Sequence, residues 1–526
     1  MSKGTKIKIA AIVAVAVLLC LGVLAVYLFG GSESRLDTEE VFYKGDAAKI
    51  NKTDEQKETL VVGSSRIPLD TKPYLHETEV GYAVNKLVYE PLADVKADGS
   101  IEPVLAKSIT FSEDGLTASV TLEEASFSDG SKLTASDVLN AYNELFSASS
   151  TYYDTDKGAV INGYYDYITG KAESISGIKV ISEHVVEFSF AKLTANNVCV
   201  LDVPIIKSGK TAYALGSGEF VIDELKPSLS MTLTKVENSR TNKYGYKKVL
   251  FKSVSSDELD KAVKSFDMDV FLTNTTTMLD IIKESGYHNV YRLRDNYYSY
   301  IGFNLSTQFG KNENVRKAVA YAVDRATVGN SYNQDYLTSL GTVSTSKGTN
   351  SFESKYPLDA EKAAECLNSA LKELGMSDGE QSDIVNETQL SLNYLCQSDS
   401  YSNGFYLNMQ QALLNAKINL TQKNVYETEY VQTLAAMDGF DVYHKLNFDN
   451  EPIDVIEGIV AQNSDINSEY EALIKESCRK DYKNLLNDIE EFVDSKCLLI
   501  PTFTGDYYAA VSADCDKDLI LDIIRP

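Results

Sequence analysis

The stretch from residue 87 to 145 constrains the fold of this chain more than any other part. Its short segments alternate between apolar and polar residues, and Asp-Gly dipeptides at 98, 114 and 129 mark tight turns between them. A helix is predicted after the third turn. Thr134 and Asp137 form a capping pattern at its start, in which a hydroxyl accepts a backbone N–H and a carboxylate lies at the positive helix end. Turn formers, caps and core positions of this kind indicate a structural role and no catalysis.

Three blocks of this stretch resemble, in the same order, the signature of the extracellular solute-binding proteins of family 5, the oligopeptide- and dipeptide-binding subunits of ABC importers. The blocks are Tyr89-Glu90-Pro91-Leu92, Phe127-Ser128-Asp129-Gly130 and Leu133-Thr134-Ala135. Later blocks extend the resemblance over residues 59 to 512: Gly216-Ser217-Gly218 as a turn, a crossing strand at 297–305, a helix at 314–325 and a strand around Pro501. The resemblance implies an α/β fold, a two-lobed periplasmic-binding-protein type II clamshell with an extra subdomain in lobe I.

The same resemblance implies where the lobes begin and end. Two crossings between the lobes, near Tyr300 and near Pro501, would form the hinge. Strand and helix patterns alternate from 390 to 442, which favours a mostly parallel sheet between helix layers in lobe II. The expected parts are lobe I at 59–300, its extra subdomain at about 85–200, lobe II at 301–497, and a return to lobe I at 498–526.

An apolar segment precedes the folded part. Residues 9–29 are uninterrupted apolar or small residues that follow three lysines. At about 1.5 Å per residue they span a hydrocarbon core of about 30 Å, and the lysines should stay in the cytoplasm. We therefore expect a single transmembrane signal-anchor within residues 1–30, a flexible linker at 31–58, and a cell-membrane location with the bulk of the chain extracellular.

Two alternatives to this anchor are open. A cleaved signal peptide would need a small-x-small site after the run, and none is evident. Lipidation at Cys20 would need a small residue directly before the cysteine, where Leu19 stands, and the chain stays apolar after it. Both observations favour the uncleaved helix.

Composition excludes several function classes. The formal charge of −26, from 50 Lys+Arg against 76 Asp+Glu, repels nucleic acid. Six cysteines outside the apolar run show no C-x-x-C pair, and the four histidines are far apart, so we expect no metal site and no cofactor. No G-x-S-x-G or H-E-x-x-H motif occurs, so we expect no enzyme. Nickel or haem cargo, known for some members of the resembled family, also finds no support in the sequence.

The resemblance further implies where a ligand lies. Peptide-binding members of the family hold an extended ligand between the lobes through backbone hydrogen bonds, and a lobe II segment with Trp and then Asp binds the α-amino group. The positions that correspond in this chain are Ser64, Ser65 and Arg66 after the first strand, Tyr298, Tyr300 and Asn304 at the crossing strand, and Asn447, Phe448, Asp449 and Asn450 in lobe II.

The lobe II segment departs from the family pattern. Its end, Asn450-Glu451-Pro452, matches, but Phe448 stands where the acid is expected, Asp449 comes one position later, and the chain has no Trp. Asp449 is then either a rebuilt amine anchor or a solvated loop acid. Without an anchor the ligand would be a blocked or cyclic peptide, or a non-peptide.

Tyrosine offers a replacement for the missing aromatic surface, since the chain has 33 of them. Ordinary packing is the alternative role for each one. The candidates near the expected ligand are Tyr297, Tyr298, Tyr300 and Tyr443.

These observations lead to one functional hypothesis and one rival. The hypothesis is a membrane-anchored extracellular protein that captures peptides or peptide-like solutes in an interlobe cleft and delivers them to ABC permease subunits. The rival is a non-transporting ligand sensor or interaction protein on the same scaffold.

Overall fold

The computed structural model describes residues 40–64, 67, 79–96, 100–150, 155–207, 213–273, 276–325, 337–338, 355–376, 388–447, 452–477 and 482–524. The apolar segment at 9–29 and Cys20 lie outside these residues. Within them, no helix combines the length and apolarity that crossing a bilayer requires.

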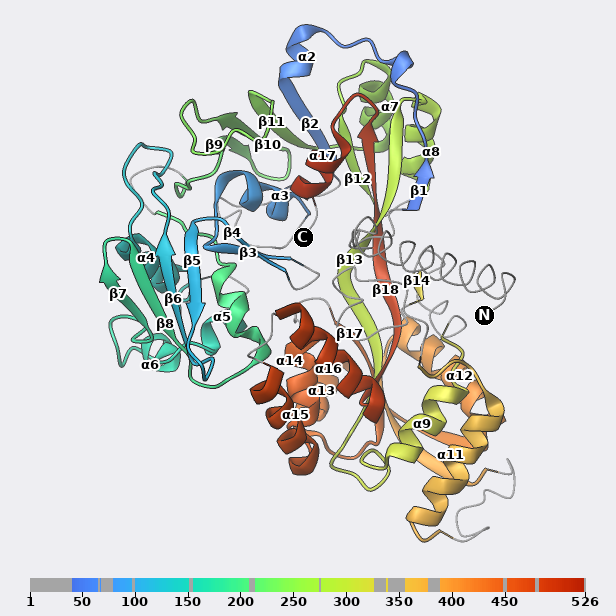
Figure 1. The fold of residues 1–526 in the computed structure, drawn as a ribbon. Helices are drawn as coiled ribbons and strands as arrows, with labels where there is room; N and C mark the ends of the chain where they lie inside the picture. Colours follow the sequence, from blue (N-terminus) through green and yellow to red (C-terminus); the bar gives the residue numbers. More distant parts are fainter. Residues whose placement is uncertain are drawn as a thin grey trace, which may run out of the picture.

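One 12-stranded sheet runs through both lobes in the order β16-β15-β17-β13-β18-β12-β2-β11-β10-β9, with β1 paired to β13 and β14 to β18. The long strands β13 and β18 pass from one lobe to the other (Figure 1). The strands are β1 (Glu40–Tyr43), β2 (Thr59–Ser64), β9 (Phe220–Lys226), β10 (Ser230–Lys235), β11 (Lys248–Ser253), β12 (Val270–Thr273), β13 (His288–Phe303), β14 (Leu337–Thr338), β15 (Leu390–Gln397), β16 (Ile418–Val425), β17 (Val442–Asn447) and β18 (Leu499–Ser512).

Lobe I is built on β2, which pairs in parallel with β11 and β12. Every residue of β12 is buried, as expected for a strand covered on both faces. The helix after β11 begins at a Ser255 and Glu258 capping box and buries Leu259, Ala262 and Val263. The helices of this lobe are α2 (Asp54–Glu58), α3 (Glu79–Val88), α7 (Ser256–Lys264), α8 (Thr276–Ser285) and α17 (Lys517–Ile524).

The extra subdomain has a separate four-stranded sheet in the order β5-β6-β8-β7. Two of the predicted Asp-Gly turns are confirmed, because Gly115 and Gly130 have φ of 69° and 81°. The predicted cap of α4 is also present, with the Asp137 carboxylate accepting from the Thr134 N–H and hydroxyl at 2.8 and 2.7 Å. The elements are β3 (Ala93–Val95), β4 (Ile101–Pro103), β5 (Ala106–Phe111), β6 (Thr117–Leu122), β7 (Ile178–Ser182), β8 (Val185–Ser189), α4 (Ala135–Leu145), α5 (Thr155–Ala159), α6 (Tyr164–Ile168) and the 3-10 helix η2 (Ala195–Leu201).

Lobe II contains the predicted parallel strands, since β15 pairs in parallel with β16 and with β17. Arg316 anchors α9 by donating to the carbonyls of Gly310, Lys496 and Cys497 at 2.6 to 3.2 Å. The helices are α9 (Glu313–Ala322), α11 (Ala360–Glu373), α12 (Ser400–Asn415), α13 (Glu427–Ala436), α14 (Pro452–Val460), α15 (Ser464–Ser477) and α16 (Tyr482–Lys496).

Residues 40–58 correct the expectation of a flexible linker. The strand β1 pairs with the lobe I half of β13, and the Lys52 ammonium, 3% exposed, lies 2.6 Å from Asp269 and 2.8 Å from Asp514. The stretch is polar, so its packing depends on strand pairing and buried charge, which hydrophobic periodicity does not reveal. We call residues 40–58 the N-terminal arm.

Candidate ligand-binding site between the lobes

The pairing of β13 with β18 is irregular where the strands leave lobe I. Between the pairs Arg294↔Asp506 and Tyr298↔Thr504, β13 advances by more residues than β18. Between Ser299↔Phe503 and Tyr300↔Pro501 the extra residue is on β18. Such bulges bend and twist a strand pair, so the irregular segment is the natural place for a hinge.

The carboxyl ends of the parallel strands in the two lobes face each other across this hinge. In lobe I, β12 pairs with β18 from Val270↔Val511 to Thr273↔Tyr508, so its carboxyl end is the end nearer the hinge, and β2 ends beside it at Ser64. In lobe II, β17 ends at Asn447, which pairs with Tyr298 in the irregular segment. Ligands of open α/β sheets bind at carboxyl ends of strands, so this junction is the candidate site.

One face of the hinge strands carries an aromatic pair and a lysine. Tyr300 pairs in register with Lys445, and Gly302 with Tyr443, so strand alternation places these side chains on the same face. The rings of Tyr300 and Tyr443, each 2% exposed, meet edge to face at a centroid distance of 6.0 Å. A Cβ on Gly302 would lie 2.2 Å from the Tyr443 ring. Burial raises the pKa of Tyr443 to about 12, so its hydroxyl stays protonated.

The opposite face is held together by a buried polar chain. Ser299 Oγ lies 2.6 Å from His444 Nε2 and 2.7 Å from Thr502 Oγ1, joining the neighbouring strands β17, β13 and β18. His444 stacks on Phe405 at a centroid distance of 3.6 Å. Burial lowers the pKa of His444 to about 3, so the ring is neutral. Ser299 and Thr502 are fully buried, which makes this chain a brace of the hinge with no access to a solute.

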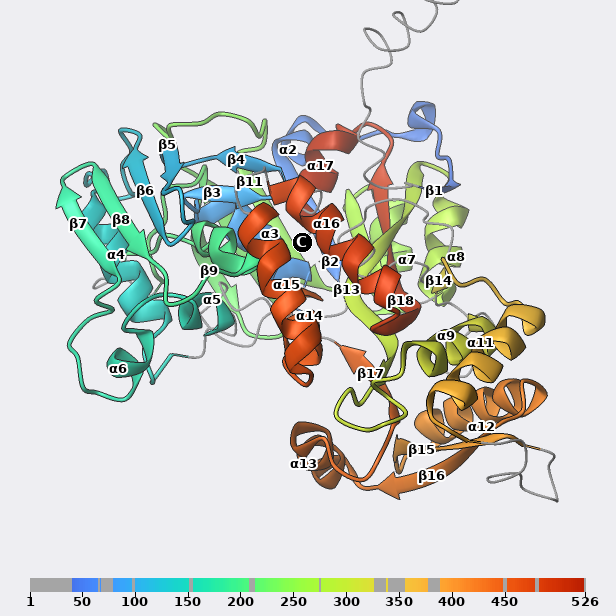
Figure 2. The ribbon, with the colours of Figure 1, turned by 60° about the horizontal axis from the view of Figure 1, so that its bottom comes forward.

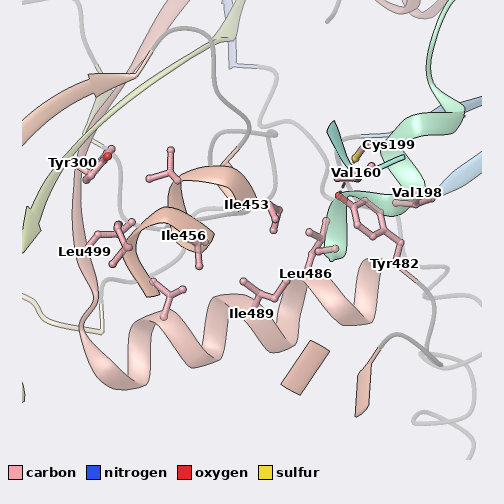
Figure 3. Close-up of a cluster of buried hydrophobic side chains, with 14 of the residues drawn as sticks. Val160, Val198, Cys199, Tyr300, Ile453, Ile456, Tyr482, Leu486, Ile489 and Leu499 are labelled. Atoms are coloured by element: carbon pink, nitrogen blue, oxygen red, sulfur yellow. Dashed lines mark hydrogen bonds between the residues drawn. The ribbon is translucent and has the colours of Figure 1, made fainter. Parts of the chain in front are cut away.

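The extra subdomain of lobe I also touches lobe II directly. The 3-10 helix η2 contacts α16 of lobe II, and α5 packs on η2 (Figures 1 and 2). In Figure 3, Val160, Val198 and Cys199 of the subdomain lie around the ring of Tyr482, and Leu486 and Ile453 follow on the lobe II side.

Three polar contacts accompany this packing. Asn196 Nδ2 donates to Asp454 Oδ1 at 2.5 Å, Lys192 Nζ lies 2.8 Å from Glu457, and Cys199 Sγ lies 3.4 Å from the Tyr482 hydroxyl. We call these contacts the interlobe bridge. It holds the lobes together on the side of the hinge that carries Tyr300.

The structure locates part of the predicted ligand-binding set. Ser64 is buried at the carboxyl end of β2, and Tyr300 is buried on the hinge face. The backbones of Tyr298 and Asn447 are paired at the junction. Five predicted residues lie outside the described part of the chain: Ser65, Arg66, Phe448, Asp449 and Asn450.

Asn304 is placed differently from its predicted role. Its amide donates to the carbonyls of Met437 and Phe440 at 2.9 and 3.0 Å, and its oxygen accepts from the N–H and hydroxyl of Ser306 at 3.1 and 2.6 Å. All four of its hydrogen-bonding positions are used, and the residue is fully buried. In this geometry Asn304 braces the turn after β13 and offers no polar atom to a ligand.

Sequence reasoning missed the functional interest of Lys445, His444 and Asn196. Side chains alternate between the two faces of a strand, so the sequence could have indicated that Lys445 shares a face of β17 with Tyr443. Nothing in the sequence relates His444 to Ser299 or Asn196 to Asp454, because both contacts join segments far apart in the chain.

Comparisons with known proteins agree with this architecture. A family model described as bacterial extracellular solute-binding proteins, family 5 Middle, matches residues 100–455. A dipeptide-binding protein of Lactococcus lactis is 27% identical over 417 residues, covering 70% of this chain and 73% of the relative. The oligopeptide-binding protein OppA of Bacillus subtilis is 25% identical over 365 residues, covering 63% and 66%.

A solved structure shares the fold. The periplasmic murein tripeptide binding protein MppA, in an unliganded open form, superposes with a TM-score of 0.69 at 16% identity, covering 86% of this chain and 93% of that one. The two-lobed α/β fold is therefore that of periplasmic binding proteins. With the family model matching more than half of its length, the chain belongs to the bacterial extracellular solute-binding proteins of family 5.

Proposed function

We propose that this protein captures peptides or peptide-like solutes between its lobes and delivers them to an ABC permease. The observation that carries the proposal is the junction where carboxyl ends of parallel strands from both lobes meet at an irregular hinge. The solute class is supported by the dipeptide- and oligopeptide-binding relatives. In this proposal residues 9–29 anchor the protein in the cell membrane, with the lobes outside.

The proposed mechanism involves binding and motion only. An extended solute would lie along the strand ends at Ser64 and Asn447 and make backbone hydrogen bonds, which are independent of side-chain sequence. Rotation at the irregular segments of β13 and β18 would bring the lobes together around it. The solute shifts the equilibrium toward the closed form because it contacts both lobes only there.

The interlobe bridge supports this mechanism by favouring closure. Asn196 and Asp454 form a hydrogen bond to a charged group, which contributes about 1.5–3 kcal/mol when it is shielded from water. Opening would expose the apolar side chains around Leu486 and break this bond. A solute would therefore bind to a pair of lobes that already attract one another.

Thermal unfolding in the presence of a peptide mixture tests the proposal. A solute that binds only the folded protein stabilises it by about 2.7 kcal/mol at about a hundredfold excess over Kd, so the unfolding temperature should rise. Free amino acids at the same concentration serve as the control. If peptides of two to eight residues leave the unfolding temperature unchanged, the proposed solute class is wrong.

Uptake separates transport from the rival function. Cells that lack this protein should lose accumulation of a labelled peptide that the purified protein binds. Bound peptide combined with unchanged uptake would favour a sensor on the same scaffold.

Anchoring has its own test. The protein should stay with the membrane fraction through a high-salt wash and be released by detergent, because an apolar span is held by the bilayer core and not by charge. Release by salt alone would contradict the anchor.

A further inference from the structure

Lys445 is unlike the other buried lysines of this protein. Lys52, Lys86 and Lys235 each have a carboxylate within 2.6 to 3.5 Å, and the half-buried Lys252 and Lys423 each donate to a backbone carbonyl. Lys445 is half-buried on β17, yet within the described residues its side chain makes no ion pair and no hydrogen bond. Its ammonium has therefore lost much of its water without gaining a protein partner.

Such an arrangement costs free energy. An ammonium group removed from water without a counter-charge is destabilising, and buried charges in proteins are normally paired. Desolvation lowers the pKa of Lys445, because burial disfavours the charged ammonium relative to the neutral amine. A methionine or leucine at this position would avoid the cost. We therefore expect Lys445 to act when a ligand is bound and not to stabilise the ligand-free fold.

The position of Lys445 indicates that role. It lies across from Tyr300 and two residues before Asn447, the carboxyl end of β17 that faces lobe I. It shares its face with Tyr443, whose ring contacts Tyr300. The candidate site between the lobes therefore contains a desolvated cation that has no counter-charge among the residues the structure describes.

We propose that Lys445 binds an anionic group of the solute, a carboxylate such as the C-terminus of a peptide. The inference rests on the proposed function and deepens it by naming the solute charge that is selected. A charge-assisted hydrogen bond in a site shielded from water is stronger than a neutral one, so the carboxylate replaces the water that Lys445 has lost. The formal charge of −26 disfavours anions over the molecule as a whole, so a local cation is needed to select one.

The assignment changes what a solute needs in order to bind. The family pattern selects a free amino group through an acid in the segment where this chain has Phe448. With Lys445 as the anchor, a free carboxylate is required and a free amine is not. An N-blocked peptide would then bind as well as an unblocked one.

Calorimetric titration with three probes tests the inference: the tripeptide Ala-Ala-Ala, its C-terminal amide and its N-acetyl derivative. The native protein should bind the free acid and the N-acetyl form alike, and the amide about tenfold more weakly or worse. Lys445→Met should bind acid and amide equally, and Lys445→Arg should keep the preference. Lys423→Met, on strand β16 of the same lobe and separated from β17 by β15, is the matched control and should behave like the native protein.

The ligand-free variants separate ligand binding from a structural role. Lys445→Met should keep or raise the unfolding temperature, because it removes an unpaired desolvated charge; a clear drop would mean that Lys445 stabilises the fold, and would overturn the inference. Equal binding of acid and amide by the native protein, or a preference that survives in Lys445→Met, would also overturn it while leaving peptide capture intact. If none of the three probes binds, peptide capture itself fails and the assignment falls with it.

Discussion

At the scale of single residues, the protein uses buried charge sparingly and in defined places. Lys52 is the clearest example. Burial alone would lower the pKa of Lys52, but Asp269 and Asp514 outweigh that effect and raise it, so the ammonium stays charged inside lobe I. Asp269 also accepts from the Val61 N–H at 2.7 Å, which ties the N-terminal arm to the first strand of the sheet.

The first prediction concerns this ion pair. Lys52→Met should lower the free energy of unfolding by about 3–5 kcal/mol, because it leaves Asp269 buried beside Asp514 without a counter-charge. Chemical denaturation monitored by circular dichroism measures the loss. Lys57→Met is the matched control: its pair with Asp54 is exposed, with side chains 60% and 102% accessible, and should contribute less than about 1 kcal/mol. Equal losses in the two variants would contradict a buried role for Lys52.

The second prediction concerns acid stability through His288. Its Nε2 donates to the Met268 carbonyl at 3.0 Å, and burial first, then the nearby Lys52, lowers its pKa from 6.5 to about 4. His288 is protonated near pH 6.5 in the unfolded chain, but only near pH 4 in the folded protein. Stability from this residue is therefore complete above pH 6.5 and declines by about 3 kcal/mol as the pH falls toward 4.

Urea unfolding from pH 7 to 4 measures this slope. His288→Gln should show a shallower decline than the native protein, whatever its stability at neutral pH. Asp514 also acts on His288, and burial raises the pKa of Asp269, which shares Lys52 with Asp514. The result is therefore the difference between the two curves and not the native curve alone. Parallel curves would contradict the assignment.

At the scale of elements, the hinge strands combine irregular pairing with close packing. Bulges on β13 and β18 permit bending, while the Ser299, His444 and Thr502 chain keeps β17 aligned with both. On the other face Gly302 leaves room for Tyr443. In the proposed mechanism β13 and β18 would bend at the bulges while β17 keeps its register.

The third prediction tests this element. Gly302→Ala should displace Tyr443 and, with it, the face that carries Lys445, so peptide affinity should fall about tenfold or more while both lobes still fold. Gly458→Ala on α14 is the control, because a Cβ there meets nothing within 4 Å and alanine favours the helix. Calorimetric titration of both variants with a peptide measures the two affinities. Native affinity in Gly302→Ala would mean that Tyr443 is not part of the binding face.

The elements also show what could be predicted from the sequence. The turns at Gly115 and Gly130 and the cap of α4 depend on residues close in the chain, and they were predicted correctly. Lys445 and His444 depend on the register between β17 and β13, which periodicity does not specify for two partly buried strands. Asn304 was predicted from a family position, but its environment is set by the turn at 437–440.

At the scale of the whole molecule, the lobes are joined in two ways, by the hinge strands and by the interlobe bridge. The bridge couples the extra subdomain, which the sequence suggested only as an insertion, to the helices that follow β17. In the proposed mechanism the subdomain would therefore take part in closure. The N-terminal arm packs on lobe I through the pairing of β1 with β13.

The fourth prediction addresses closure. Asn196→Ala combined with Lys192→Ala should increase the radius of gyration of the ligand-free protein and weaken peptide binding by up to about tenfold, since one charged hydrogen bond and one surface pair are lost. Small-angle X-ray scattering and calorimetry measure the two effects. Lys171→Ala, which removes an exposed pair with Asp166 in the same subdomain, is the control. An unchanged radius and affinity would show that the bridge does not bias closure.

The central claim is that a peptide-like solute binds between the lobes. Mass spectrometry of the material released when the gently purified protein is unfolded tests it most directly. The result predicted is a peptide or peptide-like molecule with a free carboxylate, retained at about one per protein and absent from protein that was unfolded, washed and refolded. A retained solute without peptide character, or none in a protein that no peptide stabilises, would contradict the claim.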